Sequence, residues 1–234
     1  MKIILTAKRN PSMTRPQFFA HLRHEHWPLV RRFPEVLAQI RRYEQNHSFL
    51  PEEDGDVTTP WRRAVERDSV IEVWFKDFDG LHRMDAAPNY ANFVSPDEAV
   101  FNDLKDNVLL TAREELFHHT SVCGRIKRFD FLYRNVDHAR FESACGEAAR
   151  SLALDPLFQA LADRQTIHFP VREDGSMPAE TDTAAVVATW TSSLDAMARL
   201  SGTRFAEGFA QVADPDRSFS VLATTFPIHR AAEA

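Results

Sequence analysis

Two hydrophobic patterns alternate along the first part of the chain. Short runs rich in β-branched and aromatic residues predict strands at 2–8, 40–49, 70–75 and 109–117. Apolar residues spaced three or four apart predict a helix that starts at Thr14, where Pro16 and Gln17 are typical start signals. Weaker helical signals lie around 79–84 and from Ser95. The order β-α-β-β-α-β is the ferredoxin-like arrangement.

The remaining residues repeat that order. Strands are predicted near 125–133, 165–171, 185–190 and 218–226, with helices beginning at Asp137 and Leu194. Thr14 matches Asp137 at an offset of 123, because 137 − 14 = 123, and Phe18 matches Phe141 at the same offset. Identity between the halves is thin, so an internal duplication is an inference from element order and turn chemistry.

A four-stranded sheet with helices on one side leaves its other face bare, and two such sheets can cover each other. The expected fold is therefore α+β, with two tandem ferredoxin-like β-α-β-β-α-β halves packing sheet to sheet as an intrachain α/β barrel. Residues 1–119 form the half that carries the candidate site, and residues 120–234 form a degenerate second half.

Composition and charge narrow the class of protein. The 234 residues are 44% hydrophobic and 26% charged, a globular balance, and the net charge is 28 − 34 = −6, which argues against a nucleic-acid partner. No apolar run approaches the roughly 20 residues that span a membrane. Cys123 and Cys145 have no metal-ligand spacing. We expect a cytoplasmic protein with reduced thiols, no metal and no cofactor. Its oligomeric state stays open, and a homodimer is one possibility.

A long acidic segment separates the second and third predicted strands. Residues 51–68 include six acids and three arginines, and most loops are only about 4–6 residues long. One interpretation is a solvated extension of a hairpin. The other is a lid over a pocket, with Trp61 folded inward.

Three histidines lie on the first helix, and their directions differ. At about 100° per residue, counted from Phe18, His26 falls near 80°, inside the arc of apolar side chains, whereas His21 and His24 fall on the solvent side. His26 is either a core histidine or a neutral general base whose pKa is lowered by burial. At the offset of 123 its counterpart is Ala149, since 26 + 123 = 149, which favours a role in one site only.

The second and third strands carry further candidates. Alternation places Tyr43 and His47 on one face of the second strand, and Asn46 on the other. Tyr43 could donate a proton to an oxyanion. His47 matches His168 at an offset of 121, because 168 − 47 = 121, and so looks architectural. Glu72 shares a face with Trp74, and a buried carboxylate needs a partner, for which we expect Arg9.

Several motifs of the first half belong together. They are Lys8-Arg9, residues 14–19, His26-Trp27-Pro28 and residues 42–47, followed by residues 70–75 and Asp97-Glu98. Together they resemble the EthD family of ferredoxin-like, dimeric α/β-barrel proteins. Members usually have His-Ala-Pro where this chain has His26-Trp27-Pro28, so the bulky Trp27 would reshape the mouth of the site.

The resemblance implies an aromatic-lined pocket with His26 as its most family-typical polar residue. We expect an enzyme without a cofactor, of isomerase, lyase, decarboxylase or cyclase type, that transfers a proton on a small cyclic or aromatic carbonyl compound. The alternatives are an oxidoreductase or monooxygenase of ether or aromatic degradation, and a non-catalytic protein that binds a hydrophobic small molecule. The candidate catalytic residues are His26, Tyr43 and His47, and the candidate substrate-binding residues are Arg9, Trp27, Asn46, Glu72 and Trp74.

Overall fold

The computed structural model describes residues 1–55, 57–174, 179, 182–201 and 204–231. The chain divides into two units, each with its own internal contacts. Unit 1 comprises Met1–His47, Glu66–Leu110 and Phe226–Ala234, and unit 2 comprises Ser48–Val65 and Thr111–Thr225.

The sheet of unit 1 contains β1 (Lys2–Ala7), β2 (Ile40–Ser48) and β4 (Ser69–Phe75) in the order β2–β4–β1. Both pairings are antiparallel, with Ile4 opposite Glu72 and Glu44 opposite the same Glu72. These strands lie where the apolar runs predict them, because their β-branched and aromatic residues suit a pleated, half-buried surface.

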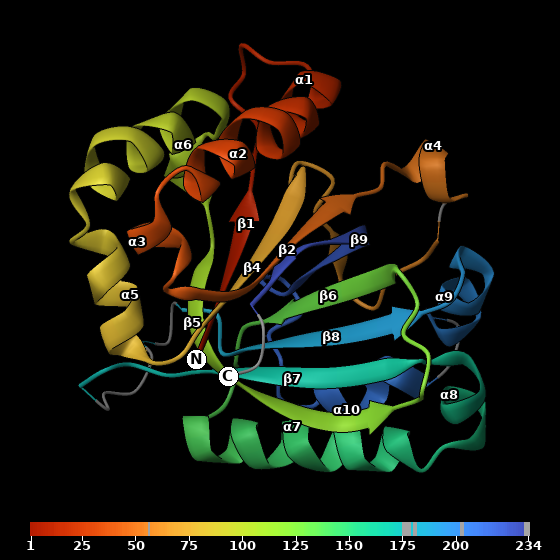
Figure 1. Ribbon diagram of the computed structural model, residues 1–234. Coiled ribbons are helices and arrows are strands. Elements are labelled where there is room, and N and C mark those ends of the chain that lie inside the picture. The colour runs from red at the N-terminus through yellow and green to blue at the C-terminus, as the bar shows by residue number, and fades with distance from the viewer. Residues whose placement is uncertain (56, 175–178, 180–181, 202–203, 232–234) are drawn as a thin grey trace. The chain divides into compact units, whose positions relative to one another are not determined.

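The helices of unit 1 all cover one face of this sheet (Figure 1). The predicted first helix is divided into α1 (Arg15–His21), a π-helical turn (Leu22–His26) and α2 (Trp27–Arg31), and is followed by α3 (Pro34–Leu37). Further along are α5 (Phe78–Asp85), a second π-helical turn (Tyr90–Val94), α6 (Ser95–Phe101) and a 3₁₀ turn (Leu104–Asp106). Thr14 caps the start of α1, as predicted, and forms a reciprocal capping box with Gln17.

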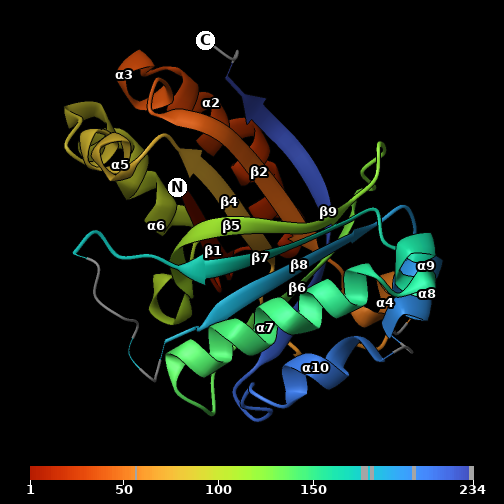
Figure 2. The same cartoon turned by 90° about the horizontal axis from the view of Figure 1, so that it is seen from below.

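The sheet of unit 2 has the order β5–β7–β8–β6–β9–β3. Its strands are β3 (Arg62–Arg63), β5 (Leu109–His119), β6 (Ile126–Leu132), β7 (Arg164–Pro170), β8 (Ala185–Thr191) and β9 (Phe219–Arg230). Its helices are α4 (Pro51–Asp54), α7 (His138–Ala153), α8 (Pro156–Leu161), α9 (Leu194–Ser201), a 3₁₀ turn (Arg204–Ala206) and α10 (Glu207–Ala210). Figure 2 shows α7 lying along this sheet with α10 beside it.

The strand order confirms the predicted fold class. In both β2–β4–β1–β5 and β7–β8–β6–β9 the second, third, first and fourth strands of a β-α-β-β-α-β unit follow one another, which is the ferredoxin-like order. The strands β5 and β9 have residues in both units, and β9 also pairs with β2. The boundary near residue 120 and the duplication stay predictions.

A repeated set of side chains supports the duplication. In unit 1, Trp74 lies opposite Lys2 on one neighbour and Arg42 on the other, with Lys2 Nζ 4.3 Å and Arg42 Cζ 4.4 Å from the indole ring. In unit 2, Trp190 lies in the same way between Lys127 and Arg164, at 3.9 and 5.2 Å. Each tryptophan is therefore placed between two cations in the same strand register.

That register corrects the predicted match between His47 and His168. Arg42 corresponds to Arg164 at an offset of 164 − 42 = 122, so His168 corresponds to Asn46 and not to His47. The His47 ring stacks on Phe19, whereas His168 Nε2 lies 2.9 Å from the hydroxyl of Thr166. A difference of one residue in a strand moves a side chain to the opposite face, which is why the sequence match was wrong.

The acidic segment 51–68 is partly built into the core of unit 2. Trp61 is buried in the hydrophobic cluster that contains Phe158 and Phe205, and the buried carboxylate of Asp54 pairs with Arg63. Asp56 lies outside the described residues. The segment is therefore more than a solvated hairpin, and a lid role stays a prediction. Both cysteines are free thiols. Within the described part of the chain, no helix is long and apolar enough to cross a membrane.

Candidate functional site

The first π-helical turn brings two histidines onto one carboxylate. His21 Nε2 lies 3.0 Å from Oδ1 of Asp97, and His26 Nδ1 lies 2.9 Å from Oδ2 of the same residue. Both imidazoles are buried, and both pack against the ring of Phe101 on α6. The predicted burial of His26 is confirmed.

The expectation that His21 faces solvent is wrong. In a regular α-helix, five residues correspond to about 500°, so His21 and His26 would point about 140° apart. The π-helical turn closes i to i+5 hydrogen bonds, such as the one from the Trp27 N–H to the Leu22 carbonyl, and this geometry aligns residues five apart. His24 is exposed, as predicted.

This geometry leaves one nitrogen of His26 available for chemistry. Nδ1 is committed to Asp97, and no described residue is hydrogen-bonded to Nε2. A carboxylate that accepts the Nδ1 proton fixes the tautomer in which Nε2 carries the lone pair, and stabilises the imidazolium that forms when Nε2 takes up a proton. His26 and Asp97 thus form a carboxylate–histidine dyad, an arrangement that is chemically able to act as a general base.

The two neighbouring acids of α6 have opposite electrostatic environments. Burial would raise the pKa of the Asp97 carboxyl, but the hydrogen bonds from His26 and His21 outweigh it and lower the pKa. Burial is the largest cause at Glu98, where it raises the carboxyl pKa. The Tyr90 hydroxyl donates to Glu98 Oε1 at 3.1 Å. The site therefore pairs an ionised carboxylate with a carboxyl that holds its proton more strongly.

Tyr43 supplies a hydroxyl on the same side of the sheet. Its ring stacks on Trp27 with 5.0 Å between the centroids, and its oxygen accepts a hydrogen bond from Gln45 Nε2 at 3.3 Å. No acceptor among the described residues takes the proton of this hydroxyl. Burial raises the pKa of Tyr43 above its ordinary value, so the group stays a protonated donor.

Gln45 links this strand to the π-helical turn. Its amide Nε2 also donates to the backbone carbonyl of Leu22 at 3.1 Å, and its Oε1 lies 3.4 Å from His47 Nε2. Tyr43, Gln45 and His47 thus share one face of β2, as strand alternation predicts. We call these three residues the Tyr43 row. The His47 ring lies between Phe19 at 4.0 Å and Phe226 at 4.7 Å. Burial, followed by the charges of Arg23 and Arg15, lowers the pKa of His47 to about 3, so it is neutral.

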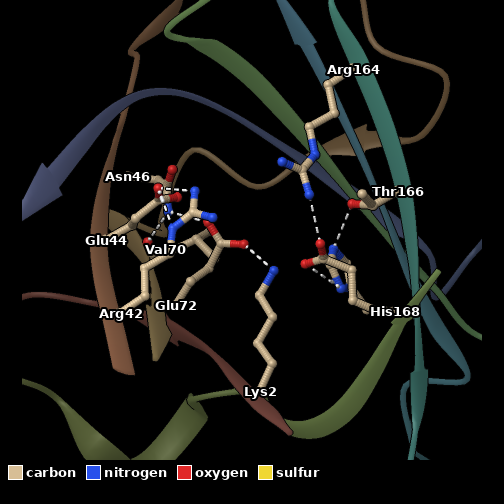
Figure 3. A network of polar contacts seen from close by, with 10 residues as sticks. Lys2, Arg42, Glu44, Asn46, Val70, Glu72, Arg164, Thr166 and His168 are labelled. Atoms are coloured by element: carbon tan, nitrogen blue, oxygen red, sulfur yellow. Dashed lines mark hydrogen bonds and ion pairs between the residues drawn. The ribbon is translucent and has the colours of Figure 1, made fainter. Parts of the chain in front are cut away.

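Four predicted binding residues lie elsewhere in unit 1. Asn46 and Glu72 face the opposite side of the sheet from Tyr43, where Asn46 Nδ2 donates to Glu72 Oε2 at 2.9 Å (Figure 3). Trp74 lies on that face as well. Arg9 is beyond the end of β1, where its backbone N–H donates to Asp68.

The expected partner of Glu72 is also corrected. Lys2 Nζ lies 2.6 Å from Glu72 Oε1, and both side chains are buried (Figure 3). Glu72 lies opposite Ile4 in the antiparallel register, and Arg9 is five residues further on, or about 16 Å along the strand. Arg9 instead pairs with Asp68.

Unit 2 has a polar group of its own on β7. Arg164 Nη2 donates to Glu114 Oε1 at 2.7 Å, and His168 and Thr166 lie beside it (Figure 3). His168 Nδ1 also lies 3.7 Å from Glu114 Oε2, a longer histidine–carboxylate contact than the 2.9 Å between His26 and Asp97. In the described part of the chain, no three His, Cys, Asp or Glu side chains are placed to hold a metal ion.

Sequence reasoning missed the partners of the predicted residues. Asp97 and Glu98 entered as part of a predicted helix start and of the family resemblance, not as site residues, and Gln45 and Tyr90 were not singled out. The helical pattern of α6 does not indicate that its residue Asp97 contacts His26, which lies 71 positions earlier in the chain. The acid pair at the start of a helix was the available clue, and it is also typical of ordinary helix capping.

One family model matches the part of the chain that contains these residues. The EthD domain model matches residues 10–105, which contain every residue of the dyad and of the Tyr43 row. No protein with a curated description matches the sequence.

Solved structures resemble the whole chain at low identity. An anthrone oxidase-like protein has a TM-score of 0.63 at 8% identity and covers 100% of this chain and 95% of its own. A proposed monooxygenase from Lactobacillus acidophilus has a TM-score of 0.52 at 9% identity, covering 97% and 98%. A chlorite dismutase variant from Candidatus Nitrospira defluvii has a TM-score of 0.53 at 8% identity, covering 97% and 90%. These likenesses show the fold.

Proposed function

We propose, on the premise that residues 10–105 form an EthD domain, that this protein is an enzyme that moves a proton on a small cyclic or aromatic carbonyl compound without a bound cofactor. The observation that carries the proposal is the contact of 2.9 Å between His26 Nδ1 and Asp97 Oδ2, with Nε2 left without a partner among the described residues.

Each residue has a stated role in this proposal. His26 Nε2 removes a proton from a carbon activated by the carbonyl group, and Asp97 holds the imidazole in the required tautomer. The Tyr43 hydroxyl, whose proton has no acceptor among the described residues, donates to the enolate oxygen that forms. Trp27 and Phe101 supply aromatic surface for the substrate ring.

The enolate has two chemical fates, which separate the candidate reaction classes. Return of the proton to a different carbon gives an isomerisation. Reaction with dioxygen at an activated methylene gives a carbonyl group and water, consuming one O₂ per methylene oxidised. The names of the similar structures, an anthrone oxidase-like protein and a proposed monooxygenase, favour testing the second fate.

Anthrone is a suitable probe because its methylene group is activated by the ring carbonyl. In D₂O without oxygen, the wild-type protein is expected to catalyse exchange of the methylene hydrogens, followed by NMR. His26→Gln and Asp97→Asn should each lower the exchange rate by about 10²–10⁴-fold. His24→Gln, on the exposed side of the same turn, is the matched control and should leave the rate unchanged.

Four outcomes decide between the candidates. Exchange that survives His26→Gln at the wild-type rate contradicts the proposal. Anthrone that binds but neither exchanges nor reacts supports the non-catalytic binding protein. Oxygen uptake in an aerobic repeat, with one water formed for each new carbonyl, assigns the oxidative class, and exchange without oxygen uptake favours the isomerase or lyase class.

A further inference from the structure

An arginine and two aromatic rings surround His47 at one end of the Tyr43 row. Arg23, on the π-helical turn, places its guanidinium carbon 3.7 Å from the centre of the Phe226 ring. The imidazole of His47 lies between that ring and Phe19, almost parallel to Phe19 at 6°. We call these four residues, Arg23, His47, Phe19 and Phe226, the arginine end of the site.

The charge of Arg23 is not balanced by a carboxylate of the described residues. Arg23 forms no ion pair with any of them, and its buried Nη2 has no hydrogen-bond partner there. The neighbouring Arg15 differs, because its Nε lies 3.6 Å from Asp68 Oδ1. A buried N–H of a cation without an acceptor is costly, so the position favours an anion that supplies one.

His47 does not add a second positive charge beside Arg23. Its low pKa keeps it neutral, and its Nε2 is committed to Gln45 Oε1. The edges of the flanking aromatic rings carry partial positive charge, which attracts the negatively charged oxygens of a carboxylate. The groups that face the imidazole are Arg15 from α1, Arg23 from the π-helical turn, Gln45 from β2 itself and Phe226 from β9.

The distance to the reacting groups sets the size of the ligand. From Tyr43 to His47 the strand advances four residues, or about 13 Å. A compound of two or three fused rings covers that length with its carbonyl near the Tyr43 hydroxyl and its far end near Arg23.

From this geometry we infer that the substrate is a cyclic or aromatic compound that bears a carboxylate, and that Arg23 binds the carboxylate beside His47. The inference rests on the proposed function for the reacting end of the molecule. Arg23 is here a specificity-determining residue, and the dyad of His26 and Asp97 is not part of the arginine end.

The test uses 2-naphthoate and its neutral analogue 2-naphthamide, titrated into the full-length protein by calorimetry. Arg23→Gln is expected to weaken 2-naphthoate binding about tenfold or more and to leave 2-naphthamide unchanged, because only the anion uses the guanidinium. Arg31→Gln, an exposed arginine of α2, is the matched control and should change neither. Arg23→Lys should keep part of the preference for the anion.

A second measurement does not depend on a variant. NMR titration of His47 in the wild-type protein should show its pKa rise when 2-naphthoate is bound, since a nearby carboxylate favours the protonated imidazole. 2-Naphthamide should give no such rise.

The outcomes separate this inference from the proposed function. Failure of the wild type to bind 2-naphthoate, or equal affinity in the wild type and Arg23→Gln, overturns the inference while the exchange of anthrone is unaffected. Displacement of 2-naphthoate by inorganic phosphate at equal concentration also overturns it, because the site would then bind simple anions. If His26→Gln loses the exchange of anthrone and still binds 2-naphthoate, the result supports both the inference and the proposed function.

Discussion

Asp97 contacts two imidazoles, and each of its oxygens accepts from one of them. At the scale of single residues, this explains why two histidines predicted to diverge converge on one site. The same carboxylate orients His26 and anchors His21, so removal of its charge affects both rings. A neutral side chain of the same shape, as in Asp97→Asn, keeps the packing and loses the preference for one imidazole tautomer.

The neutral, buried His47 gives a prediction for stability as a function of pH. Its pKa is about 3 in the folded protein and about 6.5 in an unfolded chain, so below pH 6.5 the unfolded state binds a proton that the folded state does not. The free energy of unfolding should therefore fall as the pH drops from 6.5 toward 3, by about 1.4 kcal/mol per pH unit from this group.

Replacing His47 with phenylalanine removes this titration and keeps the ring stack on Phe19. Urea unfolding at pH 6.5, 5.5 and 4.5 should show a shallower loss of stability in His47→Phe than in the wild type. Equal slopes in the two proteins would falsify the assignment of a strongly lowered pKa to His47.

At the scale of elements, the π-helical turn is the feature that no periodic pattern predicted. It adds one residue to a helix, and it lets a helix that begins at a capping box continue with its buried face intact. Gln45 donates to the Leu22 carbonyl at the start of this turn, so β2 and the helix support the same local geometry.

Deleting one residue from the turn tests what it contributes. Without the exposed His24, the segment can become a regular α-helix in which His21 and His26 are four residues apart, about 40° from each other. We expect this variant to keep the helical circular dichroism and to exchange anthrone within about tenfold of the wild type, because both rings can still reach Asp97.

A deletion ahead of both histidines is the control for this experiment. Loss of the exposed Ala20 rotates the buried Phe18 by about 100° relative to the histidines. It should lower the Tm by about 4–10 °C, because the packing of a core aromatic is lost. If the variant without His24 keeps its fold and loses exchange, the width of the π-helical turn is itself required.

At the scale of the whole molecule, the two units do not coincide with the two sequence halves. Unit 1 contains residues from Phe226 onward, and unit 2 contains Ser48–Val65 from the first half. Trp61, in the first half of the sequence, is buried in the hydrophobic core of unit 2.

We therefore predict that residues 1–119 and 120–234, produced separately, do not fold to stable proteins. Each fragment lacks strand or core residues that its unit uses. NMR spectra of each fragment should show poor dispersion, and urea unfolding should lose its cooperativity. A well-dispersed spectrum of residues 1–119 alone would show instead that the first half is an independent domain.

Much of the fold was predictable, and the reason is local. The strands, the capped helix starts at Thr14 and Asp137 and the ferredoxin-like order follow from periodicity and turn chemistry, which are properties of neighbouring residues. The burial of His26 and the shared face of Tyr43 and His47 follow in the same way.

Contacts between distant residues required the tertiary structure. Asp97 reaches His26 across 71 positions, Lys2 and not Arg9 reaches Glu72, and one residue of register separates His168 from the equivalent of His47. Periodicity states which face a side chain occupies, and says nothing about which of several charged groups from another element meets it there. The sequence alone thus determined the elements, their order and the burial of His26, and only the packing of α6 against the π-helical turn decided which carboxylate contacts it.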